Sequence, residues 1–379
     1  MKRKIVISIL LSMVFLGNIV LNISAVSLGG ISAKAYVLLE AQTGKVIASK
    51  DEHKMLPMAS TTKIMTTLLM LESGGLDDEF MVDNEAIKVE GSSMGLCEND
   101  IVTKRALCYG MMLPSGNDAA NQTAVMLAEN TDNFAVMMNE RASEIGMKNT
   151  NFVTPSGLHD DNHYSTAYDM ALLAREAMKN DLFREICGTQ RAKIRFGNPP
   201  YERWLVNTNK LLHLYDYCIG VKTGFTDEAG RCLVSAAEKD GVTLICVTLN
   251  APNDWNDHIK LYDYGFSVAE IQPIEYDFSK LSVPVAGGTK NNVAVTPTET
   301  PVCVEINGEK SKVTAEVIME KFLYAPVSEG KKAGQVNFYS DDKLIFSAEL
   351  IASEECEAMK YEYKTSLLEK IVEFIKSFL

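Results

Sequence analysis

The chain has 379 residues, of which 46% are hydrophobic and 23% are charged, and its formal net charge is −13 at pH 7. This length allows two domains with a large buried core, and the composition is that of a globular protein, which excludes a disordered one. The acidic balance argues against a nucleic-acid partner, because such a partner requires a basic face.

The N-terminus has the pattern of an export signal. A basic start at 2–4 is followed by an almost wholly apolar run at 5–23 and by small residues typical of a cleavage site. We therefore expect residues 1–25 to be a signal peptide. An uncleaved membrane anchor is the alternative, since the run is nearly long enough to span a bilayer. In both cases the bulk of the protein is expected outside the cytoplasm.

The eight cysteines are scattered along the chain, and several lie in apolar runs that resemble strands. A domain of this size does not need disulfides for its stability, so we favour free thiols. No Cys-x-x-Cys pair occurs, which argues against a zinc site or redox chemistry through cysteine.

The first part of the chain predicts strands followed by helices. Two strands at 36–39 and 46–49 precede a helix at 60–71, which ends at two glycines. Three further helices are expected, and Thr166 with Asp169 forms a capping box that opens the last of them. The three ranges are 118–129, 132–145 and 166–179.

Strands return at 217–226, 231–237 and 242–249, and a helix is predicted at 254–266. Because strands flank a helical middle, we expect an α+β domain over 31–268. In such a domain one antiparallel sheet is built from both ends of the segment and is flanked by helices.

From about residue 272 the sequence changes to short β-rich runs separated by turns, which indicates a small all-β domain over 272–363. The last segment, 364–379, carries apolar residues on one helical face and charged residues mostly on the other. It suits a helix docked on its own domain or a helix in the membrane interface, and we favour membrane anchoring because nothing follows to cover the apolar face. The expected strands are 292–295, 302–305, 313–319, 336–339 and 343–350.

Three short motifs carry the chemistry: Ser60-Thr61-Thr62-Lys63, Ser115-Gly116-Asn117 and Lys222-Thr223-Gly224. A serine and a lysine three residues apart share a helical face, so the amine can reach the hydroxyl. To accept a proton near pH 7, Lys63 must lower its pKa from about 10.4 to about 7, which is roughly 4 kcal/mol. Burial, the nearby Lys222 cation and the start of a helix would all favour the neutral amine.

The first motif is weak alone, because Ser328 with Lys331 and Ser340 with Lys343 repeat its spacing on segments that we expect to be surface turns. In the second motif, Ser115 suits the relay of a proton and Asn117 suits the binding of a peptide backbone. The ordinary alternative for this segment is a helix N-cap.

The third motif lies in an apolar strand, where a glycine often marks the close approach of a ligand. The Lys222 cation and the hydroxyls of Thr223 and Thr226 suit a terminal carboxylate, and an extended peptide can add as a strand beside them. The backbone N–H groups of Ser60 and Phe225 suit an oxyanion hole. The alternative is a surface strand edge without a ligand.

In their extended forms these motifs resemble those of the low-molecular-mass penicillin-binding proteins, the serine D-alanyl-D-alanine carboxypeptidases. The resemblance is close over 31–268 and looser beyond, and it implies a β-lactamase/transpeptidase-like fold. The matching segments are 57–63, 113–120, 154–158, 164–169 and 221–226.

The resemblance implies Ser60 as the acyl-accepting nucleophile, Lys63 as its base and Ser115 as the proton relay. The substrate would be a peptidoglycan stem peptide ending in D-Ala-D-Ala, and β-lactams would acylate the same serine. The protein would then act at the outer face of the cytoplasmic membrane, in the cell-wall space. The substrate-binding residues would be Asn117, Lys222, Thr223, Gly224 and Thr226.

Two histidines, His159 and His163, are four residues apart, as in some zinc sites. They lie in a loop rich in Asp and Asn with no Glu between them, so we expect no metal and no cofactor. The open alternatives are a D,D-endopeptidase or β-lactamase on the same scaffold and, from another class, a non-catalytic wall-binding or β-lactam-sensing protein. The attached β domain and tail favour the carboxypeptidase over a freely diffusing β-lactamase.

Overall fold

The computed structural model describes residues 28–360 and 367–377. The expected signal peptide, 1–25, lies outside the described residues, as do 361–363 of the expected all-β domain and 364–366 and 378–379 of the expected C-terminal segment. The chain divides into two compact units, which we describe separately: Met1–Lys239 with Thr243–Ser267, and Asp240–Val242 with Val268–Leu379.

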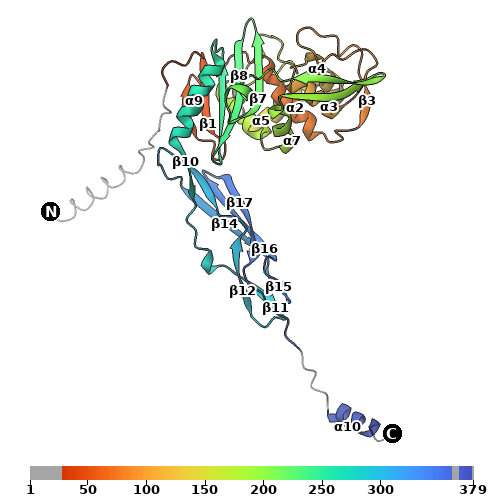
Figure 1. Ribbon diagram of the computed structural model, residues 1–379, viewed down its shortest axis with the longest axis vertical. Coiled ribbons are helices and arrows are strands. Elements are labelled where there is room, and N and C mark those ends of the chain that lie inside the picture. Colours follow the sequence, from red (N-terminus) through yellow and green to blue (C-terminus); the bar gives the residue numbers. More distant parts are fainter. Residues whose placement is uncertain (1–27, 361–366, 378–379) are drawn as a thin grey trace, which may run out of the picture. The chain divides into compact units, whose positions relative to one another are not determined.

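A five-stranded sheet with the order β2-β1-β9-β8-β7 forms the centre of the first unit (Figure 1). β1 pairs antiparallel with both β2 and β9, and β7 pairs antiparallel with β8. The strands from the two ends of the unit therefore share one sheet, as the sequence predicted. Their bounds are Ala35–Glu40 (β1), Val46–Lys50 (β2), Cys218–Thr226 (β7), Gly230–Lys239 (β8) and Val242–Leu249 (β9).

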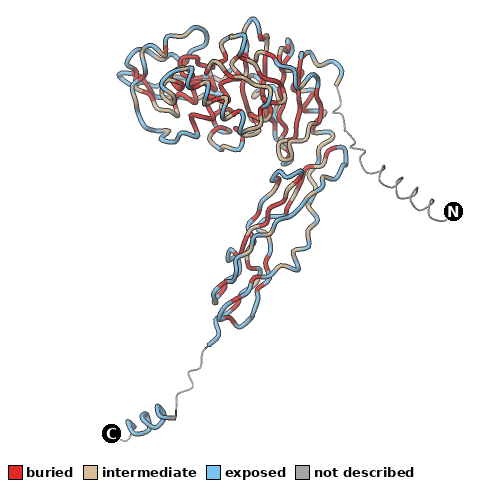
Figure 2. The backbone as a smooth tube through the Cα atoms, turned by 180° about the vertical axis from the view of Figure 1, so that it is seen from behind, coloured by how far each residue is buried: buried red, intermediate tan, exposed pale blue. Residues whose placement is uncertain are grey.

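Helices cover both faces of this sheet, so every residue of β1 is buried (Figures 1 and 2). On one face, α9 approaches so closely that a Cβ at Gly265 would lie 2.8 Å from Leu38 Cδ2 and 2.6 Å from Leu244 Cδ1. The other face packs in one apolar cluster with α2, whose residues 63–71 are all buried. A helix buried on all sides must be apolar all round, and α2 is, except for Lys63, the small hydroxyls of its threonines and the exposed Glu72 at its end.

The three helices expected in the middle of the unit are confirmed as α4, α5 and α6. The Thr166 hydroxyl caps α6 by accepting a hydrogen bond of 3.0 Å from the backbone N–H of Asp169. The expected helix at 60–71 differs at its start, because Ala59–Thr62 form a 3-10 turn (η1) and α2 begins at Lys63. The helix bounds are Lys63–Glu72 (α2), Lys104–Met112 (α3), Asn117–Ala128 (α4), Thr131–Ile145 (α5), Ala167–Ala177 (α6), Asp181–Gly188 (α7), Leu211–Leu214 (α8) and Asp254–Val268 (α9).

Two antiparallel strand pairs in this unit were not anticipated: β3 with β4, and the hairpin of β5 and β6. β5 alternates exposed charged residues with less exposed apolar ones, which is the pattern of a half-buried strand. β6 breaks this pattern, because it exposes Tyr201, Trp204 and Val206. Their bounds are Glu79–Met81 (β3), Ile101–Thr103 (β4), Arg191–Gly197 (β5) and Pro200–Val206 (β6).

The second unit contains the expected all-β domain. A six-stranded sheet with the order β14-β16-β17-β12-β11-β15 and a ribbon of β10 and β13 enclose an apolar cluster that includes Val293, Val336 and Phe338. The two additional Ser-x-x-Lys spacings, 328–331 and 340–343, fall on turns here, as expected. The strand bounds are Ala269–Pro273 (β10), Ser282–Ala286 (β11), Asn292–Pro297 (β12), Val302–Ile306 (β13), Val313–Met319 (β14), Leu323–Tyr324 (β15), Lys332–Ser340 (β16) and Lys343–Ala352 (β17).

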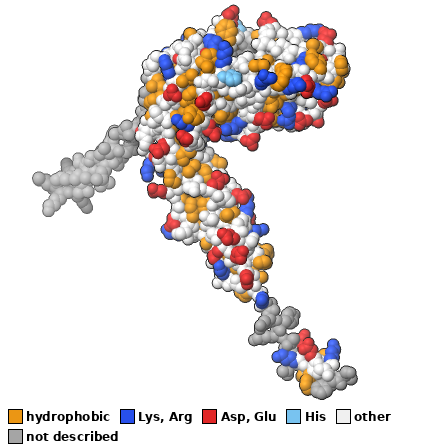
Figure 3. Space-filling model, in the orientation of Figure 1, with side chains coloured by type: hydrophobic (Ala, Val, Ile, Leu, Met, Phe, Trp, Pro, Cys, Tyr) orange, Lys and Arg blue, Asp and Glu red, His pale blue; other side chains and the backbone are white. Residues whose placement is uncertain are grey.

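Helix α10, Leu367–Lys376, lies near the C-terminus and exposes several apolar side chains. None of the helices in the described ranges is both long and apolar enough to cross a membrane. Figure 3 shows acidic and basic side chains interspersed over the visible surface of the molecule.

Candidate active site

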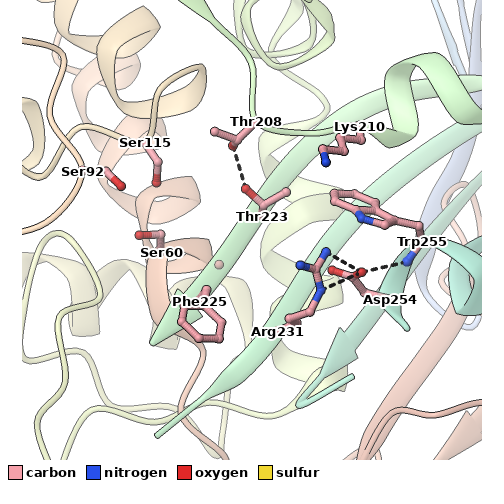
Figure 4. Close-up of a pocket in the computed structure, with 11 residues that line it drawn as sticks. Ser60, Ser92, Ser115, Thr208, Lys210, Thr223, Phe225, Arg231, Asp254 and Trp255 are labelled. Carbon is pink, nitrogen blue, oxygen red and sulfur yellow. Dashed lines mark hydrogen bonds and ion pairs between the residues drawn. The ribbon is translucent and has the colours of Figure 1, made fainter. Parts of the chain in front are cut away.

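The turn that carries Ser60 is held by hydrogen bonds of its own residues. Ala59 adopts a left-handed conformation with φ +48°, which is unusual for a residue other than glycine. The Thr61 hydroxyl donates to the Met58 carbonyl at 2.6 Å, and the Thr62 hydroxyl donates to the Ala59 carbonyl at 2.8 Å. This turn places Ser60 at the surface of a cleft, just before the first turn of α2 (Figure 4).

Lys63 is fully buried, and its amine has three polar neighbours. Nζ lies 2.8 Å from Ser60 Oγ, 2.8 Å from Asn117 Oδ1 and 2.7 Å from the carbonyl oxygen of Ser156. A neutral amine fits this arrangement, because two N–H groups donate to Asn117 and Ser156 while the lone pair accepts the Ser60 O–H. An ammonium could also donate to all three oxygens, so the electrostatic environment decides the protonation state.

Burial is the largest of the effects that lower the pKa of Lys63 well below its ordinary value. Repulsion from the Lys222 cation lowers this pKa further, and attraction to Asp118 opposes the shift. Lys222 is itself buried, and burial lowers its pKa to about 7. Its Nζ donates to the Thr223 carbonyl at 3.0 Å. These environments favour the neutral Lys63 amine that proton acceptance from Ser60 requires.

Lys222 is buried and does not line the cleft, whereas Thr223, Gly224 and Phe225, the next residues of β7, do. Alternation places Gly224 on the same face of β7 as Lys222, and at Gly224 this face lies against the Ser60 turn. A Cβ at Gly224 would lie 2.9 Å from the Met58 carbonyl oxygen and 3.1 Å from the backbone nitrogen of Ser60. Glycine is therefore required for β7 to lie against the Ser60 turn.

The second motif joins α3 to α4 beside the same serine. Ser115 has a left-handed backbone with φ +67°, and its side chain lines the cleft with Ser60 (Figure 4). Asn117 is almost fully buried and does not line the cleft; its Nδ2 donates to the Glu90 carbonyl at 2.7 Å while its Oδ1 accepts from Lys63. Asn117 thus holds the base, and its role as a substrate ligand stays a prediction.

Two other predicted residues lie near the end of β7. Phe225 is 63% exposed on the rim of the cleft, and the predicted oxyanion donors, the backbone N–H groups of Ser60 and Phe225, belong to the segments that meet at Gly224. Thr226 does not line the cleft, because its hydroxyl accepts a hydrogen bond of 3.1 Å from Ala229 N in the turn to β8.

The cleft has a volume of about 330 Å³, and one end of it carries a cation that the sequence analysis missed. Arg231 donates from Nε and Nη2 to Asp254 Oδ1 at 3.0 and 2.7 Å, and its guanidinium carbon lies 5.3 Å from the centroid of the Trp255 ring. Thr208 Oγ1 lies 2.8 Å from Thr223 Oγ1 (Figure 4). The lining residues absent from the sequence analysis are Ser92, Thr208, Lys210, Arg231, Asp254 and Trp255.

The register of the sheet would have revealed Arg231, because it pairs with Phe225 across β7 and β8. The two histidines of the predicted motif do not meet at one site: His159 approaches Asp161 at 3.4 Å in an exposed loop, whereas His163 is buried and lies 2.8 Å from the Thr62 hydroxyl behind the Ser60 turn. Within the residues that the structure describes, no group of three or more His, Cys, Asp or Glu side chains is placed to hold a metal.

Two family models match the chain. The model described as D-alanyl-D-alanine carboxypeptidase matches residues 22–253, and that of the penicillin-binding protein 5 C-terminal domain matches residues 270–358. The chain is 33% identical over 333 residues to D-alanyl-D-alanine carboxypeptidase DacF of Bacillus subtilis, covering 85% of each chain. It is 31% identical over 346 residues to DacC of Escherichia coli, covering 86% of this chain and 85% of that relative.

Solved structures agree with these matches. Penicillin-binding protein 5 from Haemophilus influenzae aligns with a TM-score of 0.62 at 29% identity, over 88% of this chain and 100% of that one. The Streptomyces K15 DD-transpeptidase aligns with a TM-score of 0.61 at 32% identity, over 64% of this chain and 100% of that one. The expected penicillin-binding-protein fold, α+β followed by all-β, is therefore confirmed, and the chain belongs to the D-alanyl-D-alanine carboxypeptidase family.

Proposed function

We propose that this protein removes the terminal D-Ala from peptidoglycan stem peptides ending in D-Ala-D-Ala, through an acyl-enzyme on Ser60, and that β-lactams acylate the same residue. The observation that carries the proposal is the buried amine of Lys63, 2.8 Å from Ser60 Oγ. Burial and Lys222 both lower the pKa of that amine, which makes it a base near neutral pH.

Acylation begins when Lys63 accepts the Ser60 hydroxyl proton and Ser60 Oγ attacks the carbonyl carbon between the two D-alanines. The backbone N–H groups of Ser60 and Phe225 stabilise the negative charge that develops on the carbonyl oxygen. The proton then passes by way of Ser115 to the leaving nitrogen, the C–N bond breaks, and D-alanine departs. Water repeats the sequence with Lys63 as base, which releases the shortened stem peptide and restores the serine.

The terminal carboxylate of the substrate lies at the end of the cleft formed by Thr223 and Arg231. Lys222 was predicted to bind this carboxylate directly, but its amine is buried and donates to its own strand. We therefore assign Lys222 to the electrostatic control of Lys63. The guanidinium of Arg231 is oriented by Asp254, and its remaining N–H groups are available for a carboxylate.

The test of this function is release of D-alanine from a D-Ala-D-Ala peptide by the purified protein. Ser60→Ala should release none, although it should keep the thermal stability of the parent. Full activity of Ser60→Ala would overturn the assignment. Cleavage of a cross-linked dimeric stem peptide would indicate the endopeptidase alternative, rapid turnover of penicillin the β-lactamase, and binding without any product the non-catalytic sensor.

We propose further that the protein is exported and that segment 364–379 anchors it at the membrane surface. In the described part of this segment, Leu368, Ile371, Val372 and Ile375 are spaced as one helical face and are 45–75% exposed. Such a face suits a helix in the interface plane. Deletion of 364–379 should move the protein from the membrane fraction to the soluble fraction, and an unchanged distribution would remove this segment as the anchor.

A further inference from the structure

We propose that His163 is a positioning residue for the reaction: its neutral imidazole joins the Ser60 turn to the loop whose Ser156 carbonyl holds Lys63, and so fixes nucleophile and base relative to each other. This inference rests on the proposed function of Ser60 and Lys63. It gives His163 a role other than the binding of a metal.

The hydrogen bonds of His163 define its tautomer. Nδ1 accepts from the backbone N–H groups of Val153 at 2.9 Å and Thr154 at 3.2 Å, so this nitrogen carries no proton. The proton is therefore on Nε2, which donates to the Thr62 hydroxyl at 2.8 Å. The ring is only 3% exposed, so water does not replace these partners.

On one side, the imidazole supports the turn that presents the nucleophile. Since Thr62 Oγ1 accepts from His163, its own proton points to the Ala59 carbonyl, 2.8 Å away. Ala59 adopts a left-handed backbone conformation, which disfavours an L-residue by about 1–2 kcal/mol. The relay through Thr62 holds this conformation immediately before Ser60.

On the other side, the imidazole supports the loop that holds the base. Thr154, which His163 binds, accepts from Gly157 N at 3.2 Å and donates from its hydroxyl to the Leu158 carbonyl at 3.1 Å. Between these residues lies the Ser156 carbonyl, 2.7 Å from the Lys63 amine. A Cβ at Gly157 would lie 1.9 Å from the Ala59 carbonyl oxygen, so this loop and the Ser60 turn are in direct contact.

A charged imidazole could not serve this purpose, because a proton on Nδ1 would face two N–H donors. Burial lowers the pKa of His163 to about 4, against the attraction of Asp160 and with a small contribution from His159. His163 therefore stays neutral over the pH range in which Lys63 must accept a proton. It touches neither substrate nor reacting atoms and acts through Thr62 and Ser156.

The experiment measures the rate of acylation by a fluorescent penicillin from pH 5 to pH 10 for three variants. His163→Phe replaces the imidazole by an apolar ring and removes all three polar contacts, whereas His163→Gln keeps a donor and an acceptor. His159→Gln, four residues away on the exposed part of the loop, is the matched control. The active fraction of each protein is titrated with penicillin, so that loss of folded protein is not counted as loss of rate.

We expect His163→Phe to acylate at least tenfold more slowly per active molecule. Because water would then reach Lys63 and raise its pKa, the acid limb of the pH profile should also move to higher pH. His163→Gln should recover most of the rate, and His159→Gln should match the parent. A purely structural role would lower the melting temperature and the active fraction but leave the profile of the remaining molecules unchanged, and that result would overturn the inference.

If His163→Phe does not fold, Thr62→Val provides the second test, because it removes the relay to Ala59 and leaves the imidazole in place. It should slow acylation in the same way, and parental kinetics would contradict the proposal. Failure of the proposed function itself is distinguishable, since the unaltered protein would then form no adduct on Ser60.

Discussion

Replacement of Arg231 by Gln should weaken the binding of a substrate with a free terminal carboxylate. The guanidinium lines the cleft and is 41% exposed at its side chain. A hydrogen bond to a charged group contributes about 1.5–3 kcal/mol, and this exposure favours the lower part of the range. A loss of about 1.5–2 kcal/mol corresponds to a rise in KM of roughly 10- to 30-fold. We expect kcat to change little, because Arg231 touches neither Ser60 nor Lys63.

The assay compares D-alanine release from a D-Ala-D-Ala peptide with release of alaninamide from the same peptide ending in an amide. The parent should prefer the free acid, and Arg231→Gln should lose most of this preference. Because Asp254 would lose its partner while its side chain is 3% exposed, the double variant Arg231→Gln/Asp254→Asn controls for the unpaired carboxylate. Arg184→Gln, which removes a surface ion pair with Glu238, controls for net charge. Equal losses on both substrates would refute a carboxylate-binding role.

Two further substitutions and the pH profile of the parent test the site. Gly224→Ala should slow acylation at least tenfold, because its Cβ would collide with Met58 O and Ser60 N; a parental rate in a stopped-flow penicillin assay would contradict the close approach. Lys222→Met removes a charge that lowers the pKa of Lys63, so the acid limb of kcat/KM should move to higher pH, and an unmoved limb would exclude that coupling. In the parent, activity should fall as pH falls through the pKa of Lys63, since the ammonium cannot accept a proton, and activity that rises toward acid pH would argue against a lysine base.

The motifs predicted the contact between Ser60 and Lys63 because each motif combines a polar side chain with the local structure that places it. Ser60 and Lys63 follow from their spacing, and Gly224 marks the contact between β7 and the Ser60 turn. The direction of a strand side chain is harder to predict. Lys222, which was predicted to bind the substrate carboxylate, is buried and donates to the Thr223 carbonyl, whereas Thr223 lines the cleft.

Arg231 and Asp254 were not predicted as site residues. They meet only when β8 and α9 lie side by side, and neither belongs to a short sequence motif. The α3 helix was not predicted. Its first turn carries Lys104 and Arg105, which are unfavourable at the positive end of a helix dipole, and it contains Gly110, a poor helix former. His163 was considered only as a metal ligand, since its partners Val153 and Thr154 bind through backbone groups that sequence does not reveal.

The central claim is that a neutral Lys63 makes Ser60 the acylated residue, and peptide mapping of the penicillin adduct by mass spectrometry tests it most directly. The account predicts a single adduct on the peptide that contains Ser60, formed at least a hundredfold more slowly in Lys63→Arg, whose guanidinium stays charged. An adduct on Ser115 or another residue, or an undiminished rate in Lys63→Arg, would contradict it.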